Sequence, residues 1–168
     1  QPSTMADVEQ LLAIKAEGNE FYKKQEYGAA IEAYSRAVKS LPDLDDEDAD
    51  ALPAELRKQA AIILCNRSAS YMYEKKAVNA LADAQLAADF DTTNWKAHWR
   101  QGLAFMMMEP RLERSEKAVA AFERTLACAS LPASERDNAV RAKEAAEYRL
   151  REGRDALDMP SMENCVVS

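Results

Sequence analysis

Five side chains in this sequence, three cationic and two carboxamides, are hydrogen-bond donors that could act together on one ligand. Lys15 and Asn19 are four residues apart, so they lie on one face of a helix. Lys96 and Arg100 have the same spacing. Lysine and arginine donate charge-assisted hydrogen bonds to carboxylates, and an amide such as that of Asn66 can donate to a carboxylate or bond a peptide backbone. The five can act together only if the helices that carry them lie side by side.

The sequence contains few residues suited to catalysis or metal binding. His98 is the only histidine, which leaves no histidine-based metal cluster and no Ser-His-Asp arrangement. Only four glycines are present and none forms a phosphate-binding loop, and no pair of acids is placed for catalysis. We therefore expect no enzymatic activity, no metal and no cofactor, and we assign His98 to packing.

The composition favours helices. Hydrophobic residues make up 48% of the 168 residues, with four glycines and six prolines. The net charge of −7 argues against nucleic acid as a partner. Three widely spaced cysteines, Cys65, Cys128 and Cys165, are typical of reduced thiols, and no apolar run approaches the ~18 residues of a transmembrane helix. We expect a cytoplasmic protein.

A small residue followed three positions later by an aromatic ring recurs three times. The copies are Gly18 with Phe21, Ser68 with Tyr71, and Gly102 with Phe105. Each is followed by a second pair, which is Ala30 and Tyr34, Ala80 and Ala84, and, four residues late, Ala118 and Phe122. The small positions let paired helices approach, and the rings fill the gap between one repeat and the next.

This pattern resembles the tetratricopeptide repeat of about 34 residues. The resemblance implies an all-α domain over residues 6–156, with three helix-turn-helix repeats in a right-handed superhelix. We expect the repeats at about 11–44, 61–94 and 95–132, a capping helix at 133–154 and a flexible tail at 157–168. Within the capping helix, Ser134 is the expected N-cap, and alanines form a narrow apolar stripe.

Two insertions interrupt the repeat period. Residues 43–50 are almost entirely acidic and are typical of a solvated loop, although a site for a basic partner is the alternative. Residues 52–59 extend the next helix at its N-terminus, opened by Pro53. Residues 109–115 lengthen the turn inside the third repeat and contain Pro110.

The five donors resemble the dicarboxylate clamp of tetratricopeptide co-chaperones. Lys15 and Asn19 stand in Lys-x-x-Gly-Asn, Asn66 in Asn-Arg-Ser, and Lys96 and Arg100 in Trp-Lys-x-x-x-Arg. In that family, two lysines, two asparagines and an arginine hold the C-terminal Glu-Glu-Val-Asp of the 70- and 90-kDa heat-shock chaperones. The resemblance implies an adaptor that binds these chaperone tails through the same five positions.

Further peptide contacts are expected one turn along the same helices. Tyr22, Met72 and Met106 would form an apolar wall for the ligand's valine, or would be ordinary packing residues. Trp99 is a further candidate contact. Tyr73 stands where some clamps carry an additional lysine, which leaves the preferred chaperone open.

The last four residues match a farnesylation signal, Cys165 followed by two valines and Ser168. The alternative function is therefore a lipidated scaffold that binds another acidic C-terminus, with partial, weak association with membranes. A second alternative is the targeting module of a larger enzyme.

Overall fold

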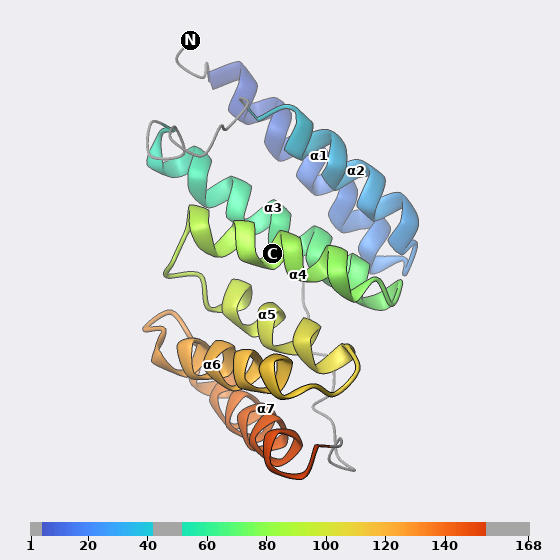
Figure 1. Ribbon diagram of the computed structural model, residues 1–168. Helices are drawn as coiled ribbons and strands as arrows, with labels where there is room; N and C mark the ends of the chain where they lie inside the picture. Colours follow the sequence, from blue (N-terminus) through green and yellow to red (C-terminus); the bar gives the residue numbers. More distant parts are fainter. Residues whose placement is uncertain (1–4, 42–51, 154–168) are drawn as a thin grey trace.

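The computed structural model describes residues 5–41 and 52–153, and in this part of the chain all regular structure is helical (Figure 1). The helices are α1 (Met5–Lys23), α2 (Tyr27–Lys39), α3 (Ala54–Tyr73), α4 (Ala77–Phe90), α5 (Trp95–Met107), α6 (Leu112–Ala127) and α7 (Ala133–Glu152). The acidic segment 43–50, the tail 157–168 and Cys165 lie outside the described residues, so the expectations for them, including prenylation, remain predictions.

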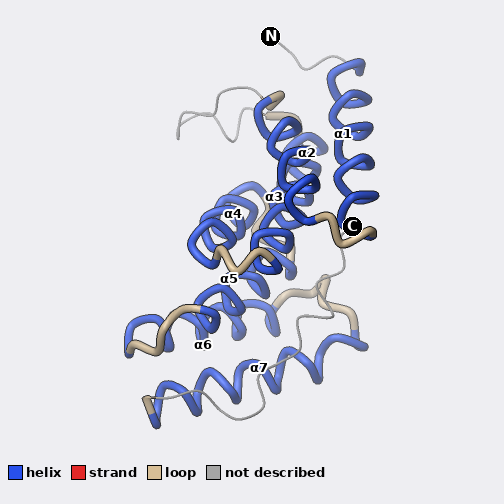
Figure 2. The backbone as a smooth tube through the Cα atoms, turned by 90° about the vertical axis from the view of Figure 1, so that its right-hand side faces the viewer, coloured by secondary structure: helices blue, strands red, loops and turns tan. Residues whose placement is uncertain are grey.

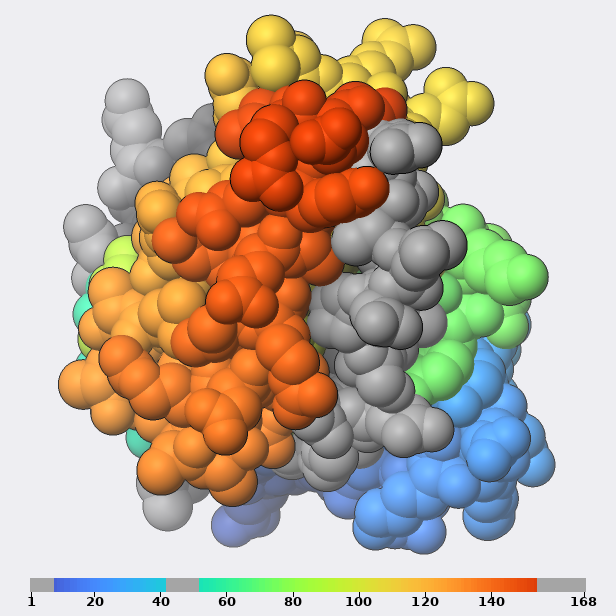
Figure 3. All heavy atoms as spheres, turned by 90° about the horizontal axis from the view of Figure 1, so that it is seen from below, coloured from blue at the N-terminus to red at the C-terminus, as the bar shows by residue number. Residues whose placement is uncertain are grey.

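The helices form three antiparallel pairs, α1 with α2, α3 with α4 and α5 with α6, and each pair packs on the next. Seen from the side, they follow one another from α1 at the top to α7 at the bottom (Figure 2). Helix α7 packs on α6 and covers the end of the array, as the view from below shows (Figure 3). The expected all-α superhelical arrangement of repeats is confirmed.

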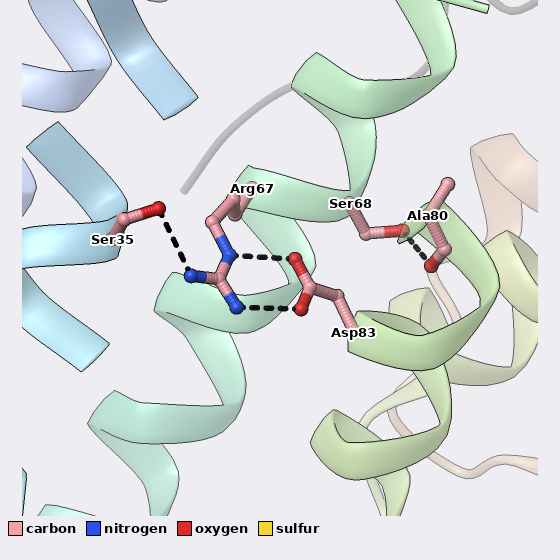
Figure 4. Close-up of polar contacts among 5 residues, drawn as sticks. All are labelled: Ser35, Arg67, Ser68, Ala80 and Asp83. Carbon is pink, nitrogen blue, oxygen red and sulfur yellow. Dashed lines mark hydrogen bonds and ion pairs between the residues drawn. The ribbon is translucent and has the colours of Figure 1, made fainter. Parts of the chain in front are cut away.

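A small residue against a large ring holds the first and third pairs together. A Cβ atom added to Gly18 would lie 2.4 Å from the Tyr34 ring, and one added to Gly102 would lie 2.4 Å from the Phe122 ring. The second pair lacks the ring, because Ala84 stands where the other pairs have Tyr34 and Phe122. There Ser68 takes the glycine position and donates a hydrogen bond to the carbonyl oxygen of Ala80 at 2.7 Å (Figure 4). Complementary volumes therefore join the first and third pairs, and a hydrogen bond joins the second.

The turns inside the first two pairs have a left-handed residue after the helix end. Gln25 has φ of 62° and Lys75 has φ of 57°, and the two occupy equivalent positions in their repeats. This conformation closes the helix C-terminus but strains residues other than glycine by roughly 1 kcal/mol. In the third pair the longer turn contains Pro110, and residues 108–111 are not left-handed.

Helix α7 differs from expectation in two respects. The prediction of Ser134 as its N-cap is wrong, because the helix begins at Ala133 after Pro132 and no side chain caps it. Arg149, which the alanine stripe did not suggest, is 1% exposed and donates to the carbonyl oxygens of Phe105 at 3.1 Å and Met106 at 2.8 Å. It also donates to the carbonyl oxygen of Met108. Arg149 thus satisfies the last carbonyls of α5 and ties α7 to the third pair.

Candidate peptide-binding site

The five predicted donors come from the first helix of each pair. Lys15 and Asn19 lie on α1, Asn66 on α3, and Lys96 and Arg100 on α5. Helix α3 contacts both α1 and α5, so the middle helix is the one on which the others can converge.

Asn19 and Asn66 meet directly across two repeats. Asn66 Nδ2 donates to Asn19 Oδ1 at 3.0 Å, and the Tyr34 hydroxyl donates to the same oxygen at 2.7 Å. Asn66 and Tyr34 have no exposed surface. Because Asn19 Oδ1 accepts from two fixed donors, the orientation of its amide is set, and its Nδ2 is the group turned away from them.

Arg100 brings a buried positive charge to this network. Its side chain is 1% exposed, and its Nε and Nη1 have no hydrogen-bond partner in the part of the chain that the structure describes. Burial raises the pKa of the Tyr34 hydroxyl, and the charge of Arg100 acts in the opposite sense. Burial also raises the pKa of the Cys65 thiol, and the charges of Arg100 and Lys96 oppose this. Arg100 therefore lies within electrostatic reach of side chains on α2 and α3.

Lys96 lies at the edge of a cavity of about 350 Å³ beside Asn66. The side chain of Asn94 accepts a hydrogen bond from the Lys96 backbone N–H at 3.1 Å, which fixes the start of α5. Lys96 Nζ stands 5.9 Å from the centre of the Trp95 ring. The cavity is lined by Lys58, Ile62, Cys65, Asn66, Asp91, Thr93, Asn94, Trp95, Lys96 and Ser130.

Lys15 on α1 contacts α3 through a side-chain hydrogen bond. Its Nζ donates to Gln59 Oε1 at 3.0 Å, and Gln59 Nε2 donates to Glu55 Oε1 at 2.9 Å. Burial lowers the pKa of Lys15, and the charge of Glu55 acts in the opposite sense. Lys15 thus contacts α3 about two turns before Asn66. The structure brings Asn19 and Asn66 into direct contact, places Lys96 beside the cavity that Asn66 lines, and pairs Lys15 with Gln59.

The four further candidate contacts differ in burial. Met72, Trp99 and Met106 belong to a buried core cluster, and the Trp99 ring lies 5.3 Å from that of Phe122. Tyr22 is half-buried and packs edge-on against the rings of Tyr27 and Tyr73. Their contact with a ligand remains a prediction.

Tyr34 and Gln59 are the site residues that sequence reasoning missed. Tyr34 fits the repeat pattern as a packing ring, so nothing in the sequence singled out its hydroxyl. Gln59 lies 44 residues from Lys15, within the insertion between the first two repeats. Because the insertion interrupts the repeat period, the repeat spacing did not predict this contact. The lone histidine, His98, is 8% exposed, and its Nε2 lies 3.0 Å from the Thr92 carbonyl oxygen.

Three stacked helix pairs with a capping helix define a tetratricopeptide-repeat domain. No protein-family model matches the chain. Protein unc-45 homolog B from Xenopus tropicalis is 33% identical over 124 residues, which are 74% of this chain and 11% of that protein. The chain therefore spans about a tenth of the length of this curated relative.

Solved structures agree with this fold. The second tetratricopeptide domain of Spaghetti (RPAP3), bound to the HSP90 peptide SRMEEVD, is 27% identical, with a TM-score of 0.58 over 74% of this chain and 99% of that one. The second such domain of human RPAP3, in complex with the HSP70 peptide SGPTIEEVD, is 24% identical, with a TM-score of 0.63 over 84% and 98%. The chain has the tetratricopeptide-repeat fold, and both of these solved neighbours are tetratricopeptide domains bound to chaperone peptides. Within the described residues, no helix has both the length and the apolar character needed to cross a membrane.

Proposed function

We propose that the site on α1, α3 and α5 is a dicarboxylate clamp, and that the protein is an adaptor for heat-shock chaperones. The ligand is a peptide with a free C-terminal aspartate, as in Glu-Glu-Val-Asp. Such a residue presents two carboxylates, one from the main chain and one from the side chain. The two domains of Spaghetti and human RPAP3, whose peptides both end in this way, support the choice of ligand.

The observation that carries the proposal is the buried guanidinium of Arg100. A buried cation with two nitrogens lacking partners in the described chain is costly unless a ligand completes its hydrogen bonds. A carboxylate is the natural complement, because it accepts two parallel N–H bonds from arginine. Each charge-assisted bond contributes ~1.5–3 kcal/mol before the cost of ordering the ligand.

The asparagines supply the neutral part of the clamp. Tyr34 and Asn66 orient the amide of Asn19 by donating to its Oδ1. An amide N–H so oriented is a suitable donor for a ligand carboxylate or backbone carbonyl. The positive charges of Lys15 and Lys96 contribute longer-range attraction. A site with several such bonds to a short flexible peptide gives a dissociation constant of roughly micromolar, or about −8 kcal/mol.

The experiment compares two peptides that differ only at their last group. One ends in Glu-Glu-Val-Asp with a free carboxylate, and the other carries the same sequence as a C-terminal amide. We expect the acid to bind in calorimetry and the amide to bind at least tenfold more weakly, because each lost charge-assisted bond costs ~1.5–3 kcal/mol. Equal affinity for the two peptides would contradict a clamp that binds the C-terminal carboxylate.

A charge-reversal variant tests the edge of the site. Lys96→Glu places a carboxylate beside Asn66, so we expect binding of the free acid to be lost. Lys24→Glu is the matched control. Lys24 is exposed in the turn between α1 and α2, and it does not line the cavity beside Asn66. Equal losses in both variants would indicate a general electrostatic effect and would contradict a local role for Lys96.

A further inference from the structure

The junction between the first two repeats is bridged by the chain's own arginine. Arg67 on α3 donates from Nε and Nη2 to the two carboxylate oxygens of Asp83 on α4, both at 2.7 Å. Its Nη1 donates to Ser35 Oγ on α2 at 3.0 Å. Figure 4 shows the guanidinium between the two second helices, with Ser35 on one side and Asp83 on the other. One side chain thus fills the space over α3 between α2 and α4.

The next junction lacks all three partners. By the repeat spacing, Gln101 stands at the position of Arg67, Ala121 at that of Asp83, and Gln85 at that of Ser35. Gln101 is shorter than arginine and donates from Nε2 to the carbonyl oxygen of Ala84 at 3.1 Å, without reaching α6. A cavity of about 790 Å³ lies here, with walls from α4 and α6 and a floor from α5. In Figure 1, α5 lies between these two helices. We call this cavity the α4–α6 groove.

The floor of the α4–α6 groove offers hydrogen-bond acceptors. A carbonyl oxygen can only accept, so His98 Nε2, which is 3.0 Å from the Thr92 carbonyl oxygen, carries the proton. In the neutral ring, Nδ1 is then an acceptor, and it is buried without a partner in the described chain, in a side chain that is 8% exposed. Gln101, three residues further on the same helix face, uses its Nε2 on Ala84 and retains Oε1 as an acceptor. Two acceptors on one floor favour a ligand with several N–H donors.

The rim of the groove carries charges of both signs. Asp89 lines the groove from α4. On the α6 side, Lys117 is paired with Glu113 at 2.6 Å, and Arg124 Nε donates to its own helix backbone at Ala120, 3.2 Å away. Phe105 and alanines from both walls complete the lining and suit an aliphatic stem.

We propose that the α4–α6 groove is a second docking surface, which accepts an arginine side chain from a segment of a partner protein. The incoming guanidinium takes the place that Arg67 holds in the preceding junction. It donates to the acceptors of His98 and Gln101 and faces Asp89, while its stem covers Phe105. Arginine fits better than lysine because its five donors are fixed in one plane and can reach separate acceptors. Its contact residues differ from the five of the proposed clamp, and the two cavities adjoin at Thr93 and Ser130, which line both.

The lone histidine makes the test specific, because its imidazole signals in an NMR spectrum arise from one residue. The probe is N-acetylarginine amide, with N-acetylcitrulline amide as the neutral control of similar shape and N-acetylaspartate amide as the opposite charge. We expect a saturable shift of the His98 ring signals with the arginine probe, with a dissociation constant on the order of millimolar. Absence of a saturable shift, or a shift with the aspartate probe instead, would overturn the proposal.

Two variants in the groove and one in the clamp locate the binding of the arginine probe. Asp89→Lys changes an exposed residue, so the fold is retained, and we expect arginine binding to weaken by about two- to fivefold. The double variant Gln101→Arg with Ala121→Asp copies the Arg67–Asp83 pair into the groove and is expected to abolish the shift. Arg100→Ala, in the clamp, should leave it unchanged, so failure of the clamp and failure of the groove are distinguishable. An unchanged arginine response in Asp89→Lys would contradict the assignment.

Discussion

The hydroxyl of Tyr34 lies 2.7 Å from Oδ1 of Asn19, so a ring of the second helix orients a side chain of the first. The same Tyr34 ring covers Gly18, one residue before Asn19. Tyr34 therefore both packs the first repeat together and orients Asn19, a residue of the proposed site. This relation explains why the volume pattern of the repeat and the proposed clamp occur on the same helices.

Removing the Tyr34 hydroxyl should weaken peptide binding more than folding. Tyr34→Phe keeps the ring against Gly18 but releases the amide of Asn19 to rotate. We expect a loss of about 1 kcal/mol in peptide binding, or roughly fivefold in affinity, measured by calorimetry with the free-acid peptide. Tyr148→Phe on α7 is the matched control, and equal affinity in the two variants would count against the positioning role.

Gly18→Ala should destabilise the first helix pair. The new methyl group would lie 2.4 Å from the Tyr34 ring, which is fully buried and cannot move freely. We expect a loss of ~1–3 kcal/mol in the free energy of unfolding in urea. Gly28→Ala is the control, because nothing lies within 4 Å of its added methyl group and alanine favours a helix. A stabilised Gly18→Ala protein would show that the close approach is not required.

Arg149→Met should loosen the capping helix. The substitution removes a buried side chain that donates to the last carbonyls of α5 and leaves those carbonyls without these donors. We expect a loss of about 2–4 kcal/mol in stability, with faster amide exchange in α7 than in α3. Arg151→Met, on the exposed side of the same helix, should change stability little. Uniform exchange across the chain would contradict a role specific to α7.

Lys75→Gly should stabilise the turn of the second repeat. Lys75 has φ of 57°, which glycine adopts without a steric penalty. We expect a gain of about 0.5–1 kcal/mol in thermal or urea unfolding, partly offset by the greater freedom of glycine in the unfolded chain. Lys58→Gly, at an exposed position inside α3, is the control and should destabilise the protein by about 1 kcal/mol instead.

The sequence was sufficient for the arrangement of the helices, because the small and aromatic positions recur with a fixed period. It also led to the prediction of five donors on α1, α3 and α5, of which Asn19 and Asn66 are in direct contact. It could not reveal that Tyr34 reaches Asn19 or that Lys15 reaches Gln59, since these contacts depend on the angle at which helices cross. Arg149 illustrates the same limit, because an arginine in an alanine-rich helix has the pattern of an exposed residue. Ser134 was assigned as a cap from its type alone, whereas Pro132 sets the start of α7.

The central claim is that Arg100 receives the terminal carboxylates of a bound peptide. Calorimetry with a peptide ending in Glu-Glu-Val-Asp, on the unaltered chain and on Arg100→Ala, tests it most directly, with Arg111→Ala as an exposed arginine control. The account predicts roughly micromolar binding by the unaltered chain and by Arg111→Ala, and a loss of about tenfold to a hundredfold in Arg100→Ala. Undiminished binding by a folded Arg100→Ala protein would contradict it.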